Sequence, residues 1–161
     1  MRNIIFLDID GVLNIESDSY TTAKIIQPLC EPHLVERLNY LCKKIENVEI
    51  VISSSWRKDM LDLEETLKEC GFKYWDNVIG RTSISAHSKS LKRGIQIHNW
   101  LKKNIRESFM PRIDANIFII DDEPNGVKEF WDSDFFFVDK EVGITDETIK
   151  KILSRIEIKI Y

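Results

Sequence analysis

An apolar run that ends in two aspartates opens the chain, over residues 4–14 (Ile-Ile-Phe-Leu-Asp-Ile-Asp-Gly-Val-Leu-Asn). The continuous β-branched and aromatic residues at 4–7 predict a strand that is buried on both faces of a parallel sheet. Asp8 and Asp10 follow at the end of this strand, where period-2 alternation projects both side chains to the same side. Gly11 then permits a sharp turn. The stretch therefore predicts a strand with two carboxylates at its carboxyl end.

Two interpretations of this carboxylate pair are open. Neighbouring carboxylates repel one another unless a cation lies between them, and hard oxygen ligands beside phosphate oxygens suit Mg²⁺. Alternatively, Asp and Gly are common turn residues, and the motif would then be an ordinary turn after a strand. Residues elsewhere in the sequence are needed to distinguish a metal site from a turn.

Length and composition limit the class of protein. A chain of 161 residues suits one domain with a real core, so we expect a single domain over residues 1–161. The 43% apolar and 31% charged residues are typical of a soluble globular protein. A net charge of −4 argues against a protein that coats nucleic acid non-specifically, although it is compatible with a local basic patch.

The sequence also gives expectations about the compartment. No stretch approaches the ~20 apolar residues that span a bilayer, and the first strand leaves no room for a signal peptide. The three cysteines (Cys30, Cys42 and Cys70) lack metal or redox spacing, so we expect buried free thiols. Together these features predict a cytoplasmic protein without a membrane partner. They do not predict an oligomeric state.

Strand and helix patterns alternate along the chain. Strands are predicted near residues 49–52, 78, 117–120 and 135–138, and helices at 32–45, 58–70, 93–101, 125–131 and 145–156. Residues 15–31 suggest a short flap or hairpin, and the tail at 156–161 an edge strand. Such alternation predicts an α/β fold, a mostly parallel sheet with helices on both faces. Ligands of these folds bind outside the carboxyl ends of the strands.

Polar residues gather at those predicted strand ends. They are Asp8, Asp10, Ser53, Asp121, Asp122 and Asp139. Six unrelated turn residues that happen to meet at one sheet edge are a weaker explanation than a single shared site. This convergence therefore favours a functional site over a set of turns.

The same residue types suit phosphoryl transfer. A carboxylate can attack phosphorus if Mg²⁺ screens the repulsion and a second acid protonates the leaving alcohol, roles that fit Asp8 and Asp10. A hydroxyl such as Ser53 can hold a phosphoryl oxygen, and a fixed cation can neutralise developing charge. Arg93 or Lys92 are candidates for the cation. Asp121 with Asp122 are candidates for completing the magnesium shell.

In their order along the chain, these motifs resemble the four motifs of the haloacid dehalogenase (HAD) superfamily. The resemblance implies a Rossmann-like three-layer sandwich with strand order 3-2-1-4-5 and a Mg²⁺-dependent phosphatase. It implies that Asp8 is the nucleophile, Asp10 the general acid/base and Ser53 a phosphoryl ligand. It also implies a metal site of Asp8, Asp10, Asp121 and Asp122, with Asp122 as a direct ligand and Asp121 acting through water.

A narrower resemblance is to the HAD phosphatase domains of RNA and polynucleotide end-repair proteins. It rests on Ser53-Ser54-Ser55-Trp56-Arg57, Arg93-Gly94-x-x-Ile97-x-x-Trp100-Leu101 and Asp121-Asp122-Glu123 leading to Phe130-Trp131. The resemblance implies a free-standing phosphatase for 3′-phosphorylated RNA or DNA ends, with Ser53, Ser54, Arg57 and Arg93 binding phosphate. For Arg57 an ion pair with a site aspartate is an equal alternative.

The chain departs from the superfamily pattern in three ways. Arg93 stands where a lysine is usual, with Lys89 and Lys92 as other candidates for that cation. The usual later acid is absent at Gly126 and Val127, and Asp139 is a candidate to compensate. No insertion is long enough for a cap domain, which is similar to members that act on large substrates.

Residues 81–112 hold eight basic residues against one acid, which suits a grip on a phosphate backbone or simply a solvated helix face. Two alternative functions stay open. One is a small-metabolite or nucleotide phosphatase. The other is a non-catalytic, receiver-like phosphate-binding domain, although the second strand ends in Ser53 and not in the acid that a receiver would phosphorylate.

Overall fold

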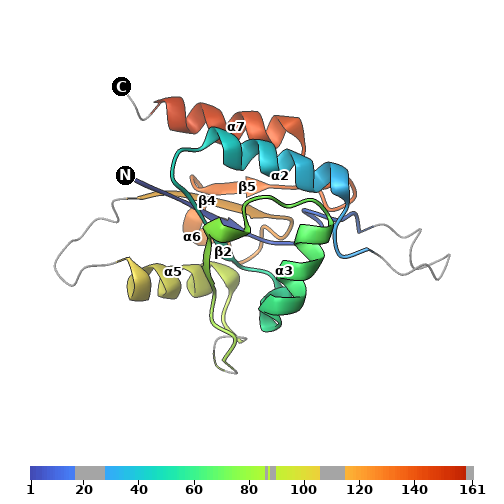
Figure 1. Ribbon diagram of the computed structural model, residues 1–161. Helices are drawn as coiled ribbons and strands as arrows, with labels where there is room; N and C mark the ends of the chain where they lie inside the picture. The colour runs from blue at the N-terminus through green and yellow to red at the C-terminus, as the bar shows by residue number, and fades with distance from the viewer. Residues whose placement is uncertain (17–27, 86, 88–89, 106–114, 159–161) are drawn as a thin grey trace.

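A five-stranded parallel sheet forms the centre of the protein (Figure 1). The computed structural model describes residues 1–16, 28–85, 87, 90–105 and 115–158. Its strands are β1 (Arg2–Leu7), β2 (Val48–Ile52), β3 (Val78–Arg81), β4 (Ala115–Asp121) and β5 (Phe135–Phe137). They lie in the order β3-β2-β1-β4-β5, so the α/β class, the strand order 3-2-1-4-5 and the central first strand are confirmed.

Helices cover both faces of the sheet and make it the middle of three layers. The α-helices are α2 (Pro32–Lys44), α3 (Met60–Glu69), α5 (Arg93–Asn104), α6 (Lys128–Trp131) and α7 (Asp146–Ile158). Two short 3₁₀ helices, η1 (Ser55–Lys58) and η2 (Trp75–Asn77), lie in connections. Helices α2, α3 and α7 share one apolar cluster with the sheet, and α5 and α6 share the other. The described residues contain no separate cap domain.

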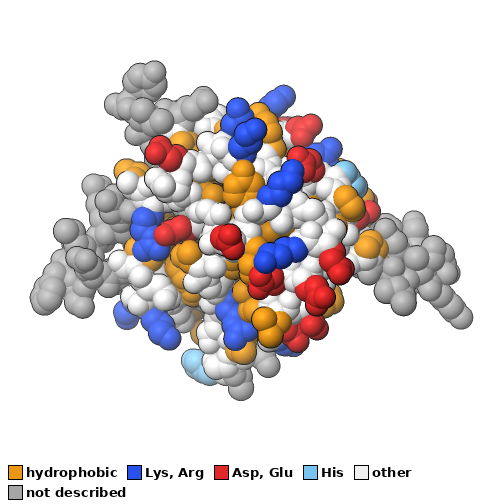
Figure 2. Space-filling view, viewed as in Figure 1, with side chains coloured by type: hydrophobic (Ala, Val, Ile, Leu, Met, Phe, Trp, Pro, Cys, Tyr) orange, Lys and Arg blue, Asp and Glu red, His pale blue; other side chains and the backbone are white. Residues whose placement is uncertain are grey.

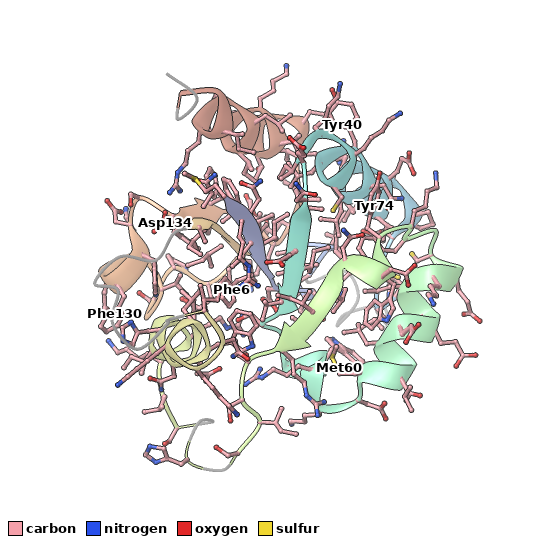
Figure 3. The ribbon with its side chains drawn as sticks, turned by 60° about the vertical axis from the view of Figure 1, so that its left-hand side comes forward. Phe6, Tyr40, Met60, Tyr74, Phe130 and Asp134 are labelled. Atoms are coloured by element: carbon pink, nitrogen blue, oxygen red, sulfur yellow. The ribbon has the colours of Figure 1, made fainter. Side chains whose placement is uncertain are left out.

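The alternation of side chains along β1 explains why its apolar run is continuous. Ile5 and Leu7 belong to the cluster under α2, α3 and α7, whereas Ile4 and Phe6 belong to the cluster under α5 and α6. All four side chains are fully buried. Phe6 meets Trp100 of α5 edge to face, with ring centroids 5.5 Å apart, and Figure 3 labels it beside this helix.

Three local predictions differ from the structure. The predicted helix at 125–131 begins only at Lys128, because Gly126 has a φ of +80° that an α-helix does not accept. The predicted helix at 58–70 begins at Met60, after the η1 turn. The predicted edge strand at 156–161 was wrong where it is described, since α7 continues to Ile158. Most of the flap predicted at 15–31 lies outside the described residues.

Two of the cysteines are enclosed. Cys30 and Cys42 are buried and Cys70 is half-buried, and all three are free thiols. Burial raises the pKa of Cys42 to about 12 and also raises the pKa of Cys30, so neither is a ready nucleophile. Among the described helices none is long and apolar enough to cross a membrane.

Candidate functional site

The ends of three neighbouring strands bring the candidate residues into one row. Backbone pairing continues past the strands, with Asp8 N–H donating to Ile120 O at 3.1 Å and Ser53 N–H donating to Leu7 O at 2.8 Å. Asp121 ends β4, so Asp121, Asp8 and Ser53 follow one another across the carboxyl edge. The predicted convergence at this edge is therefore present for the residues of β4, β1 and β2.

Three carboxylates form the centre of the site. One oxygen from each of Asp8, Asp121 and Asp122 lies within 4.8 Å of the other two. Asp8 is 5% exposed and Asp121 is fully buried. Arg93 Nη1 lies 2.9 Å from Asp8 Oδ2 and 2.5 Å from Asp121 Oδ2. Arg93 pairs with two of the three carboxylates, so its single charge leaves negative charge in excess at this site.

This excess of negative charge changes the acidities. Burial and the charge of Asp8 raise the pKa of Asp121 to about 6, although Arg93 opposes the change. Burial, Asp8 and Asp121 together raise the pKa of Asp122 to about 7. Burial alone would lower the pKa of Arg93, but Asp8 and Asp121 outweigh it and raise that pKa. A group of three carboxylates with unbalanced charge fits a divalent metal ion that prefers oxygen ligands.

Asp10 is held apart from these three carboxylates. Trp56 Nε1 donates to Asp10 Oδ1 and Oδ2, both at 3.0 Å, and Asn14 Nδ2 donates to Oδ1 at 3.0 Å. The group of close carboxylates in the described chain does not include Asp10. Its predicted role as a metal ligand stays a prediction. Trp56 belongs to a motif named from the sequence, but its contact with Asp10 was not predicted there.

Gly11 is required by the geometry of this loop. Its φ is +70°, and a Cβ built on it would lie 2.6 Å from Asp122 Oδ2. Gly11 N–H donates to Asn14 Oδ1 at 2.8 Å, which closes the turn after β1. The glycine therefore lets Asp122 approach the backbone of the loop that carries Asp8 and Asp10.

Ser53 offers a hydroxyl without a partner in the described structure. Its side chain is 1% exposed, and its Oγ has no hydrogen-bond partner there. The next serine differs, because Ser54 Oγ accepts from Trp56 N–H at 3.3 Å and caps η1. An unpaired buried hydroxyl is unfavourable unless a ligand satisfies it. The predicted phosphate contact of Ser54 stays a prediction, with its hydroxyl already engaged.

Arg57 connects the segments after β2 and β3 to helix α5 through hydrogen bonds. It is 8% exposed, and it donates to Ser54 O at 2.7 Å, Ser83 O at 3.3 Å and Gln96 Oε1 at 3.1 Å. Burial and the charge of Arg93 lower the pKa of Arg57, while Asp8 raises it. No ion pair between Arg57 and an aspartate is present in the described structure. Its predicted contact with phosphate is not tested.

A close approach between two glycines sets the position of Arg93. Gly94 N–H donates to Gly126 O at 2.7 Å, and Trp131 Nε1 donates to Gly94 O at 2.9 Å. A Cβ on Gly94 would lie 2.5 Å from Gly126 O. The start of α5 is thus fixed against the loop before α6. Sequence reasoning named this glycine in a motif but not its role.

The basic stretch at 81–112 does not act as one surface in the described residues. Arg93 enters the site, Lys92 pairs with Glu129 at 2.7 Å, and Arg81 Nη1 donates to Arg57 O at 2.6 Å. Lys89, Arg106 and Arg112 lie outside the described residues. On the face drawn in Figure 2, basic and acidic side chains are interspersed. The structure therefore brings Arg93, and not Lys92, to the carboxylates.

Asp139 lies at the same sheet edge, outside the three close carboxylates. Its side chain is exposed and accepts from Glu141 N–H at 2.9 Å within the turn after β5. The group of close carboxylates in the described chain does not include it. Its predicted role as the compensating acid stays a prediction.

A parallel sheet with its first strand central, and carboxylates at the carboxyl edge of that strand, is the arrangement of a HAD-like domain. Over residues 4–149 the chain matches the family described as the HAD domain in Swiss Army Knife RNA repair proteins, and it belongs to that family. No curated protein and no solved structure matches the chain.

Proposed function

We propose that this protein is a Mg²⁺-dependent phosphomonoesterase that works through an aspartyl phosphate on Asp8 and acts on the 3′-phosphate ends of nucleic acids. The observation that carries the proposal is the partnerless Ser53 hydroxyl beside the three carboxylates and Arg93. A hydroxyl donor, a fixed cation and a divalent-metal ligand set are what a phosphate dianion needs in order to approach a carboxylate.

Asp8 suits the role of nucleophile because it is held in place from two sides. Ile9 N–H donates to Asp8 Oδ1 at 2.9 Å, and Arg93 faces Oδ2. Asp8, Asp121 and Asp122 would hold the metal ion, which supplies the positive charge that screens this carboxylate from the phosphate. Arg93 adds a permanent positive charge at the same place.

Asp10 suits proton transfer because it carries no ion pair in the described structure and its position is fixed by two neutral donors. Trp56 and Asn14 orient the carboxylate. In the first step Asp10 gives a proton to the leaving alcohol. In the second step it takes a proton from the water that attacks the acylphosphate. Ser53 Oγ–H donates to a phosphoryl oxygen in both steps.

The nucleic-acid end is the substrate class that the family description favours, since that description names RNA repair proteins. The absence of a cap domain among the described residues fits a site that accepts the end of a long strand. A small-metabolite or nucleotide phosphatase would use the same chemistry and is the alternative that the experiment separates. A receiver-like domain has less support, because Ser53 stands at the end of β2 and the family is of the HAD type.

The test is phosphate release from three substrates in the presence of Mg²⁺ or a chelator. The substrates are an oligonucleotide with a 3′-phosphate, its 5′-phosphate counterpart and a generic aryl phosphate. Wild type should release phosphate from the 3′ end, and Asp8→Asn should lose all but a few per cent of that activity. Asp139→Asn is the matched control, because it changes an exposed aspartate of the same sheet edge outside the carboxylate group.

Each result has a distinct meaning. Release from the aryl ester alone would keep the chemistry and discard the nucleic-acid substrate. Release that continues in chelator, or in Asp8→Asn, would refute the metal dependence or the nucleophile. No release from any substrate would bring back the receiver-like hypothesis, which a lasting phosphoprotein after acetyl phosphate treatment would support.

A further inference from the structure

A groove outside the carboxylate site lies between the edge strand β3 and helix α5. It encloses about 480 Å³, a volume in the range of small-ligand sites. Figure 3 shows α5 almost end-on, close to the end of β3. The residues that matter for its chemistry are Arg81, Thr82, Ser83, Gln96, Trp100 and Lys103.

The groove begins beside the site. Thr82 N–H donates to Ile52 O at 3.0 Å, so Thr82 continues the row of Asp8 and Ser53 by one more strand. Neighbouring strands are about 4.8 Å apart, which puts the backbone of Thr82 about 10 Å from that of Asp8. On the helix side the groove starts at Gln96, one turn after Arg93, and runs to Lys103, about 10 Å further along α5 at 1.5 Å per residue.

The side chains of the groove suit an anionic strand. Two cations, Arg81 and Lys103, line it, and none of its described lining residues is acidic. Lys103 is exposed and takes part in no ion pair within the described structure. Ile79 and Ile84 are 43% and 37% exposed at the rim, where they offer apolar surface to a sugar or base. A positively charged groove that follows the phosphate backbone is a usual component of a single-strand binding site.

Thr82 provides a second, independent sign of a ligand. It lines the groove, it is fully buried, and its Oγ1 has no hydrogen-bond partner in the described structure. Three buried polar side-chain atoms lack a partner there, and two of them, Ser53 Oγ and Thr82 Oγ1, belong to adjacent strand ends. Buried hydroxyls are normally satisfied, so each of these two atoms indicates a partner that the described residues do not supply.

We propose that the groove binds the oligonucleotide strand that leads to the scissile 3′-phosphate. The terminal phosphate lies at Asp8 and Ser53, the Thr82 hydroxyl donates to an oxygen of the last nucleoside, and Lys103 with Arg81 faces the preceding phosphodiester. The proposal rests on the proposed function, since it names the path by which that substrate enters the site. Small aryl phosphates do not reach Lys103.

The test compares two adjacent lysines of α5. Lys103 lines the groove, whereas Lys102 is exposed on the same helix and does not line it. Phosphate release is measured from a mononucleoside 3′-phosphate, from a trinucleotide with a 3′-phosphate and from an aryl phosphate, at low salt. The readout is the ratio of kcat/KM for the trinucleotide to kcat/KM for the aryl phosphate.

Wild type should prefer the trinucleotide over the mononucleoside. Lys103→Glu should lower the trinucleotide-to-aryl ratio about tenfold, mostly through KM, because reversing a charge beside a phosphate weakens its binding. Lys102→Glu should leave the ratio within about twofold, since a solvated charge is screened by salt. Thr82→Val, which keeps the shape and removes the hydroxyl, should lower the ratio about threefold to tenfold, the value of one hydrogen bond.

The outcomes separate this proposal from the one it rests on. A wild type that cleaves the aryl phosphate and no nucleotide would overturn the substrate class and the groove together. A wild type that prefers the trinucleotide, with equal losses in Lys103→Glu and Lys102→Glu, would overturn the groove alone and indicate a diffuse electrostatic effect. Unchanged ratios in both Lys103→Glu and Thr82→Val would also overturn the groove alone.

Discussion

Adding a single methyl group at Gly94 should damage both stability and activity, because this glycine fixes the start of α5. A Cβ there would lie 2.5 Å from Gly126 O and 2.9 Å from a ring carbon of Phe130. The first contact is with backbone, which cannot rotate away. The helix end must therefore move, and Arg93, whose Nη1 lies 2.9 Å from Asp8, has to move with it.

The size of the effect follows from opposing contributions. Gly→Ala in a helix gains up to about 1 kcal/mol from propensity. Overpacking costs about 1–3 kcal/mol, and weakening the hydrogen bonds from Gly94 N–H and to Gly94 O costs about 1 kcal/mol each. We expect Gly94→Ala to lower the free energy of unfolding by about 2–4 kcal/mol. Displacing the cation should lower kcat about tenfold to a hundredfold, the range for loss of one charge-stabilising donor.

Urea unfolding and phosphate release together test this expectation. Gly80→Ala is the matched control for stability, because a Cβ on Gly80 would make an ordinary contact, 3.5 Å from Trp100 Nε1. It should change the free energy of unfolding by less than about 1 kcal/mol. A Gly94→Ala protein as stable as wild type, or more stable by the helix-propensity gain, would refute the close approach. Normal kcat in a destabilised variant would refute the link to Arg93.

Three further predictions concern the carboxylates and the proposed proton donor, Asp10. In chelator the raised pKa values of Asp121 and Asp122, about 6 and 7, mean that the native state holds more protons than the unfolded chain between about pH 4 and pH 7. The contribution of these two groups to stability is therefore lost as pH rises through that window, and the Tm of Asp122→Asn should exceed that of wild type more at pH 8 than at pH 5. A Tm difference between Asp122→Asn and wild type that becomes smaller toward pH 8 would contradict this direction of the pH dependence. Adding Mg²⁺ at pH 8 should raise the Tm of wild type and raise that of Asp122→Asn less. For wild type, an ion at a hundred times its Kd adds about 2.7 kcal/mol to the free energy of unfolding. Equal Tm shifts in the two proteins, measured by differential scanning fluorimetry, would argue against Asp122 as a ligand. Trp56→Phe removes the donor to Asp10 and should lower kcat about threefold to tenfold for an alkyl phosphate ester, and less for an aryl phosphate, whose leaving group needs less protonation. Equal losses on the two esters would show that Trp56 does not act through the proton donor.

Local sequence patterns within single strands and helices predicted much of the fold. The apolar run at 4–7 was continuous because β1 is buried on both faces, and its position before Asp8 fixed one end of the site. The helix at Pro32 and the cap at Thr145, whose Oγ1 accepts from Thr148 N–H at 3.2 Å, also follow from local chemistry. The tail at 156–161 failed because its short alternation also suits the last turn of an amphipathic helix.

The ion-pair and hydrogen-bond partners of the basic side chains could not be predicted from the sequence. Lys92 and Arg93 are neighbours in the chain, and only the packing of Gly94 on Gly126 turns Arg93 toward Asp8 while Lys92 meets Glu129. Arg57 donates to the carbonyl of Ser83 and the side-chain amide of Gln96, which lie far from it in the sequence.

The sequence by itself determined the strands, the carboxylates at their ends and the superfamily, because these depend on residue type and on spacing over a few positions. Only the tertiary structure decided that Trp56 holds Asp10, that Ser53 and Thr82 keep unpaired hydroxyls in the described structure, and that a groove runs along α5. Those features depend on which strands lie side by side and how closely a helix approaches them. Such distances are set by long-range packing, which no local pattern in the chain encodes.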